Sequence, residues 1–279
     1  MKPRTYYSVR TGKHQQQIIP HEMMLELFFG FYNKLKEKGY FTEYFGFCCT
    51  DAGNVVGELG HDIPAAMFFK LRRNNLWPFE EKYKSYTRDE LFDLIEFLYD
   101  CCSKPTEWYY HDWNSCGNHY TQFHKASGQT EFRSEINLAL IDYEDGYELS
   151  EDGEILSLPD KGLETLLSAD LPEIDKSNVS DKVEQAILKF RRRSSSDDER
   201  KDAIRDLADV LEFLRPKAKS VLLRKDENDL FAIANNFAIR HHNAGQQTEY
   251  DKPIWYSWMF YFYLSTIHAT IRLIQKHSA

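Results

Sequence analysis

The sequence DLFAIANNFAIRHHN at residues 229–243 is followed, after a short polar stretch, by WYSWMFYFYL at residues 255–264. In the first segment apolar residues recur at helical spacing, and the second is the most aromatic run of the chain. We therefore predict two helices with a polar cluster at the point where one helix gives way to the other. Similar periodicity in most other segments predicts a mainly α-helical protein.

The polar cluster consists of a guanidinium, two imidazoles and three nearby carboxamides. Its members are Asn235, Asn236, Arg240, His241, His242 and Asn243. Arginine offers a fixed fork of donors to a phosphate, and histidine can take and give a proton near neutral pH. Together these groups can cleave RNA without a metal ion. The alternative is a purely structural role, in which basic residues in the last helical turn complement the helix dipole and Asn243 ends the helix.

Composition and charge limit the classes of function. The chain has 279 residues, a formal net charge of −9, and 15% aromatic residues. The acidic excess lies in residues 1–177, whereas residues 178–279 have a slight basic excess, which argues against a general nucleic-acid binder but allows one local phosphate site. No apolar run is long enough to cross a bilayer, and the first residues lack the apolar core of a signal peptide. We expect a cytoplasmic protein without membrane contact.

The cysteines do not suggest a disulfide framework. Five are present, and four of them form two adjacent pairs, Cys48-Cys49 and Cys101-Cys102. Neighbouring cysteines rarely bridge each other, and an odd number leaves one unpaired. His111, Cys116, His119 and His124 have side chains that suit zinc, but no two cysteines have the spacing of a zinc knuckle. Our interpretation is that the cysteines are buried, reduced thiols, and we expect neither a metal nor another cofactor. The histidines, with Asp112, form either a second site or hydrogen-bonded core residues.

Helical segments and turn residues predict two domains. An N-terminal helical domain spans 1–160, with helices near 21–38 and 63–73, one that begins after Thr87 and ends before Pro105, one near 132–143, and a hairpin near 146–156. Thr87 and Glu90 have the spacing of a capping box, and Asp152-Gly153 has the composition of a hairpin turn. A linker at 161–178 precedes a helical bundle at 179–279, with helices expected at 181–193, 197–214, 217–223, 227–239 and 253–275.

The C-terminal part, about 178–279, resembles the HEPN superfamily, because a basic, polar and histidine cluster ends the penultimate long helix of a helical bundle. The whole organisation resembles that of AbiJ-type abortive-infection proteins of bacteria. In the N-terminal part, the resemblance rests on Asn118-His119, Phe132-Arg133, the segment 135–137 and the Gly-Tyr-x-Leu start of the hairpin. The usual HEPN signature places histidine five to seven positions after arginine. Here Arg240 has no histidine in that window. If His241 takes the histidine position of the signature, the arginine position is occupied by Ala234 or Asn235.

The resemblance implies a homodimeric, metal-independent ribonuclease that acts in phage defence or as a toxin, with a possible neutralising or sensing partner. Arg240 would hold the phosphate, His241 or His242 would act as acid and base, and Asn236 and Asn243 would orient the histidine or the sugar. A second hypothesis is a non-catalytic sensor or scaffold. In that case the aromatic and histidine region at 106–129 binds a ligand or nucleic acid, and the C-terminal bundle only dimerises.

Overall fold

The computed structural model describes residues 6–15, 17–159, 162–167, 169–172, 174–192, 195–219 and 250–278. The fold is mainly α-helical, with three small antiparallel strand pairs among these residues. The chain divides into two compact units, Met1–Leu156 and Ser157–Ala279, and each has its own hydrophobic core. In the described residues no helix is long and apolar enough to span a membrane.

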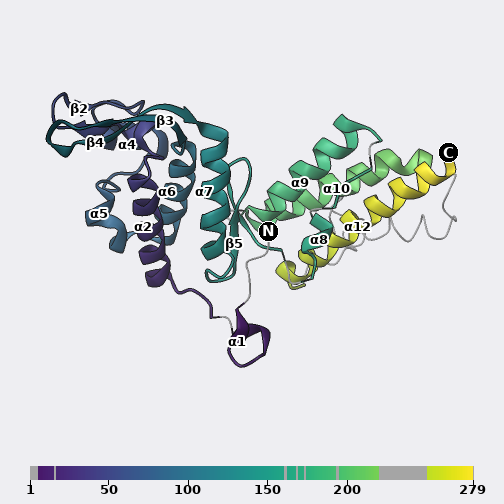
Figure 1. The fold of residues 1–279 in the computed structure, drawn as a ribbon. Helices are drawn as coiled ribbons and strands as arrows, with labels where there is room; N and C mark the ends of the chain where they lie inside the picture. Colours follow the sequence, from purple (N-terminus) through teal and green to yellow (C-terminus); the bar gives the residue numbers. More distant parts are fainter. Residues whose placement is uncertain are drawn as a thin grey trace. The chain divides into compact units, whose positions relative to one another are not determined.

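The first unit packs long helices around an aromatic core. Helices α2 (His21–Glu37), α6 (Arg88–Asp100) and α7 (Lys125–Leu140) lie side by side, and strands β2, β3 and β4 extend at one end of them (Figure 1). The apolar faces of the three helices supply much of the core, including Phe28, Leu94 and Phe132, all fully buried. The shorter elements are α1 (Tyr7–Arg10), α3 (Thr42–Phe45), α4 (Ile63–Leu71), α5 (Phe79–Lys82) and η1 (Tyr83–Ser85).

Three hairpins accompany these helices. Strand β1 (Phe47–Cys49) pairs with β2 (Gly53–Val55), and β3 (Lys104–His111) pairs with β4 (Gly117–His124) around the short helix η2 (Trp113–Ser115). Strands β5 (Tyr147–Leu149) and β6 (Ile155–Ser157) form the hairpin expected near 146–156.

The β3–β4 hairpin is longer than the other two, and the strand pattern did not predict it. Trp108, Tyr109 and Tyr110 are consecutive and all exposed, so the apolar residues do not alternate with polar ones as they do in a half-buried strand.

The second unit is a bundle of α9 (Asp181–Arg191), α10 (Asp197–Ala218) and α12 (Lys252–Ser278), with the short α8 (Glu164–Leu167) and η3 (Lys176–Ser180) beside them. Helix α10 packs along α12, and the two share a core that includes Leu207, Leu211, Phe260 and Leu264. The aromatic run of α12 thus buries one face inside its own unit.

The helix ends show which local signals were reliable. Capping boxes start α6 at Thr87 and α10 at Ser196, where Glu90 and Glu199 accept hydrogen bonds from the cap backbone. Helix α7 begins at Lys125, earlier than the expected 132, because His124 caps it. Helix α10 extends to Ala218, beyond the end expected at 214, and continues through Pro216. A proline has no N–H group, so it removes one i→i−4 hydrogen bond from the helix.

Two leucines of α7 test this description of the core. Leu140 is fully buried and Leu138 is half exposed on the same helix. We expect Leu140→Ala to lower the free energy of unfolding by about 2–5 kcal/mol, because it leaves a cavity, and Leu138→Ala by less than about 0.5 kcal/mol. Urea unfolding followed by circular dichroism measures both changes. Equal losses in the two variants would contradict this assignment of the core face.

Candidate metal centre

The residues predicted to cleave RNA, Asn236, Arg240, His241, His242 and Asn243, lie outside the described residues. The helix expected at 227–239 also lies outside the described residues. Of the helix expected at 217–223, only the part up to Lys219 is described. Among the described residues, a cluster of side chains that can bind a metal ion lies in the N-terminal unit.

Four side chains with metal-binding atoms converge where the β1–β2 hairpin meets the tip of the β3–β4 hairpin. They are Cys49, His111, Cys116 and His119, and one ligand atom from each lies within 4.8 Å of the others. Cys49 and His119 are buried, whereas His111 and Cys116 are partly exposed. The cluster is therefore shielded on the inside and reachable from solvent on the outside.

The pleat of β1 selects Cys49 over its neighbour Cys48. Successive residues of a strand point to opposite faces of a sheet, and here Cys48 is exposed while Cys49 is 4% exposed. Cys49 pairs with Gly53 at the end of the short hairpin. Its sulfur therefore points inward, toward the second hairpin.

The register of the β3–β4 hairpin places both histidines on one face. Tyr109 pairs with His119, and His111 lies two residues after Tyr109 on the same strand. Residues two apart on a strand, and residues directly opposite each other on paired strands, share a face. The two imidazole rings are 4.8 Å apart between centroids.

The turn between β3 and β4 brings Cys116 back to this face. Asn114 and Ser115 adopt left-handed backbone conformations with φ of 48° and 54°, and Gly117 has φ of 105°. Three positive φ values in four residues make a tight reversal that only small or polar residues and glycine adopt readily. Cys116 then precedes His119 by three residues, with their Sγ and Nε2 atoms 3.2 Å apart.

Backbone amides surround both sulfur atoms. The N–H groups of Asp51 and Ala52 point at Cys49 Sγ over 3.4 and 3.3 Å, and that of Thr50 points at Cys116 Sγ over 3.4 Å. The Thr50 amide, followed by His119, lowers the pKa of Cys116 to about 6. Hydrogen bonds to the charged form favour a thiolate, which is the form that binds a metal.

Two other thiols have the opposite character. Cys101 and Cys102 are fully buried at the end of α6. Burial raises the pKa of Cys101 to about 12, and it also raises the pKa of Cys102. Cys49, Cys101 and Cys102 match the interpretation of buried, reduced thiols, whereas Cys48 is exposed and Cys116 is partly exposed.

Two of the distances between ligand atoms are close to those of a tetrahedral zinc ion. With Zn–S bonds of about 2.3 Å and Zn–N bonds of about 2.1 Å, tetrahedral geometry separates sulfur from nitrogen by about 3.6 Å. The distance from Cys49 Sγ to His111 Nδ1 is 3.7 Å, and that from Cys116 Sγ to His119 Nε2 is 3.2 Å. Two thiolates and two neutral imidazoles are a ligand set that structural zinc sites use.

A second layer of contacts orients His119. Its Nδ1 atom is 3.1 Å from the hydroxyl of Tyr109, which leaves Nε2 facing Cys116. The ring of Phe47 lies 4.7 Å from that of His119 between centroids. Ligating histidines commonly bind a fixed partner through the second ring nitrogen, which holds the ring in place for the metal.

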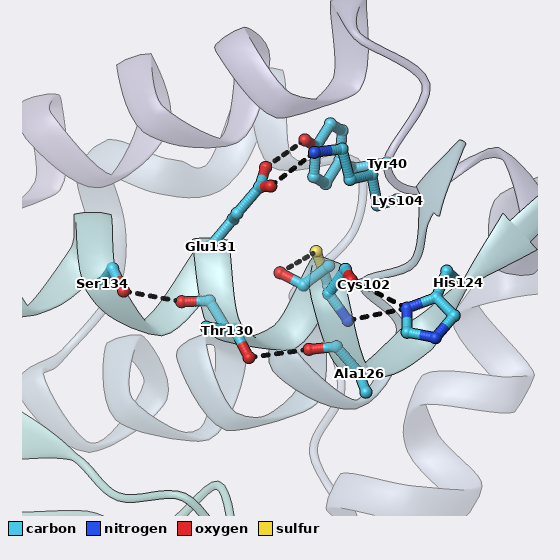
Figure 2. A network of polar contacts seen from close by, with 10 residues as sticks. Tyr40, Cys102, Lys104, His124, Ala126, Thr130, Glu131 and Ser134 are labelled. Atoms are coloured by element: carbon cyan, nitrogen blue, oxygen red, sulfur yellow. Dashed lines mark hydrogen bonds and ion pairs between the residues drawn. The ribbon is translucent and has the colours of Figure 1, made fainter. Parts of the chain in front are cut away.

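The base of the β3–β4 hairpin is fixed to α7 by polar contacts (Figure 2). Lys104 forms an ion pair of 2.6 Å with Glu131, and Tyr40 donates a hydrogen bond to the same carboxylate. His124 accepts a hydrogen bond from the Ser127 amide and so caps α7. His124, which had been grouped with possible zinc ligands, therefore has a capping role and does not belong to the cluster.

Sequence analysis named three of the four clustered residues as suited to zinc, but it favoured reduced thiols, expected no metal and did not include Cys49. The spacing Cys116-x-x-His119 is a local signal for a metal site, since zinc ligands often come in pairs separated by two residues. Cys49 lies 62 residues before His111, and only the contact between the two hairpins brings them together.

Comparison of the chain with protein-family models, with curated protein sequences and with solved structures finds no match in any of the three. The chemistry of the cluster must therefore be inferred from its own residues and geometry.

Proposed function

We propose that the N-terminal unit is a zinc-binding module in which the ion has a structural role. The observation that carries this proposal is the convergence of Cys49, His111, Cys116 and His119 within 4.8 Å. All four positions of a tetrahedral ion are filled by protein side chains. A catalytic zinc ion keeps a position for water or substrate, so this ligand set supports fold stabilisation rather than hydrolysis.

The ion would link two hairpins that are each only marginally stable alone. A two-stranded hairpin is marginally stable by itself in water, and both hairpins here have two strands. Cys49 comes from the first hairpin and the other three ligands come from the second. Zinc would thus hold the tip of β3–β4 against β1–β2.

The hairpin held in this way carries large aromatic side chains that face solvent. Trp108, Tyr110 and Trp113 are each at least 60% exposed. Exposed apolar groups that lie close together commonly mark an interaction surface. This supports a binding protein whose zinc module presents an aromatic hairpin to a ligand, in agreement with the sensor or scaffold hypothesis.

Metal analysis of adjacent cysteine variants tests the module. We expect the purified wild-type chain to hold one zinc ion by inductively coupled plasma mass spectrometry. Cys49→Ser should lose the ion because a ligand is missing, and Cys48→Ser should retain it because Cys48 points to the opposite face. Loss of zinc from both variants, or a metal-free wild type after zinc-supplemented expression and refolding, would refute the proposal.

The contact between Tyr109 and His119 gives a second test. Tyr109→Phe removes the hydroxyl that orients the ring, so we expect zinc affinity to fall by about tenfold, the lower end of effects from such outer partners. Tyr110→Phe changes the next residue, on the other face of the strand, and should leave affinity unchanged. Competition with a chromophoric chelator measures both, and equal affinities for the two variants would contradict the orienting role of the Tyr109 hydroxyl.

We propose a second function for the C-terminal unit, metal-independent cleavage of RNA by a homodimer. It is supported by the resemblance to HEPN proteins and by the packing of α10 along α12, the two helices that flank the segment bearing Arg240 and His241. Arg240 would hold the phosphate, His241 or His242 would exchange protons, and Asn236 and Asn243 would orient them. The attacking group would be the 2′-hydroxyl.

This second function predicts RNA cleavage that leaves 2′,3′-cyclic phosphate ends and spares DNA, because DNA lacks the 2′-hydroxyl. His241→Ala should lower the rate by about a hundredfold or more, since acid–base catalysis contributes at least that much. His277→Ala changes an exposed histidine of α12 and should cleave like wild type. Cleavage by His241→Ala at the wild-type rate in a gel assay with labelled RNA would exclude this mechanism.

The zinc module complicates a chelator test of metal independence. EDTA that strips the N-terminal ion would release the β3–β4 hairpin from β1–β2, without any metal at the cleavage site. The decisive form of the test therefore uses the zinc-free Cys49→Ser variant with and without EDTA. Loss of cleavage on addition of EDTA to a Cys49→Ser variant that is active without it would contradict the metal-independent mechanism.

A further inference from the structure

Two of the four clustered side chains are thiols, and they differ in exposure. Cys49 is 4% exposed, whereas Cys116 is partly exposed in the turn between β3 and β4. Their sulfur atoms belong to the set of ligand atoms that all lie within 4.8 Å of one another. An oxidant from solvent therefore reaches Cys116 first and finds a second thiol close behind it. A reachable thiol beside a resolving thiol is the usual arrangement of a redox-sensing pair.

The other three cysteines lack this arrangement. Cys101 and Cys102 are fully buried in the core of the unit, and adjacent cysteines rarely bridge each other. Cys48 is exposed, but it points to the face of β1 opposite to that of Cys49. Cys49 and Cys116 are therefore the pair that this fold places ready for oxidation.

Contacts between the two hairpins bring these sulfur atoms within reach of each other. Thr50, the residue after Cys49, donates a hydrogen bond of 3.0 Å from its hydroxyl to the carbonyl of Trp113, and its amide points at Cys116 Sγ. A disulfide requires the two sulfurs to approach to about 2.05 Å. Cys49 is the last residue of β1, and Cys116 lies in a turn, so the approach displaces a strand end and a turn and leaves the helical core in place.

We propose that peroxides convert this site from a zinc-bound pair of thiolates to a zinc-free disulfide between Cys49 and Cys116, an inference that rests on the zinc module proposed above. The Cys116 thiolate attacks hydrogen peroxide, the O–O bond breaks, and the sulfur becomes a sulfenic acid as hydroxide leaves. The Cys49 thiolate then attacks that sulfur and displaces a second hydroxide. Two protons convert both hydroxides to water. The two sulfurs lose two electrons and the peroxide gains them, because zinc itself has no redox chemistry.

The disulfide removes both sulfur ligands at once. His111 and His119 then offer only two of the four ligands that a structural zinc site provides, so the ion leaves. The new bond joins the same two hairpins that the ion joined, and the switch therefore controls zinc occupancy while the hairpins stay linked. Reduction by a dithiol restores both thiols and the site.

Peroxide treatment of the zinc-loaded Cys48→Ser chain tests this inference. The variant keeps all four ligands and leaves Cys49 as the only cysteine of β1, so a disulfide is assigned without ambiguity. We expect release of about one zinc ion per chain to a chromophoric chelator, together with the loss of two alkylatable thiols. Peptide mass spectrometry should find Cys49 joined to Cys116, and dithiothreitol with added zinc should restore the ion. The wild-type chain should release zinc in the same way.

Zinc retained after peroxide treatment, or zinc lost without a disulfide between Cys49 and Cys116, would overturn the switch and leave the zinc module standing. A reduced chain that holds no zinc would overturn the module itself before any peroxide is added, and the switch with it.

Trapping of the intermediate tests the order of attack. In a Cys48→Ser/Cys49→Ser double variant no thiol of β1 can resolve the sulfenic acid, so dimedone should label Cys116 after peroxide treatment. The buried Cys101 and Cys102 should stay unlabelled and serve as internal controls. Absence of label on Cys116 would contradict the proposal that oxidation begins there.

Discussion

The contact between two short hairpins is the constraint on which the proposed zinc module depends. Neither hairpin has a third strand, and the tip of β3–β4 lies beyond the contacts that fix its base to α7. At that tip, two thiols and two imidazoles meet from opposite sides, and the exposed aromatic residues nearby cannot supply a core of their own. A bound zinc ion would satisfy all four groups at once and would replace the missing hydrophobic contact by four coordinate bonds.

The details of the cluster agree with a structural rather than a catalytic ion. Three amides point at the two sulfurs, Tyr109 fixes His119, and the pKa of Cys116 is lowered toward the range in which a thiolate forms easily. Each of these features favours the deprotonated, fixed ligand that zinc requires. The thiols at 101 and 102 have none of these features and lie in the apolar core, where burial opposes ionisation.

Local signals in the sequence predicted the helices well, but they led us to expect no metal, and they named only three of the four clustered residues. Capping residues such as Thr87 and Ser196 act within one helical turn, so their effect can be read from neighbouring residues. The β3–β4 hairpin escaped prediction because its aromatic residues are exposed on both faces, and Cys49 escaped because its proximity to His111 arises from tertiary packing. The ribonuclease hypothesis rests on residues 236–243, which lie outside the described residues, and it stays a prediction.

The most direct test of the zinc centre is X-ray absorption spectroscopy of the zinc-loaded chain at the zinc edge. The account predicts a four-coordinate ion with two sulfur ligands at about 2.3 Å and two nitrogen ligands at about 2.0–2.1 Å. It also predicts that Cys49→Ser, if it is loaded with zinc at high concentration, shows one sulfur ligand. A first shell of oxygen and nitrogen alone, or one with four sulfur ligands, would contradict the assignment of Cys49, His111, Cys116 and His119 as the ligands.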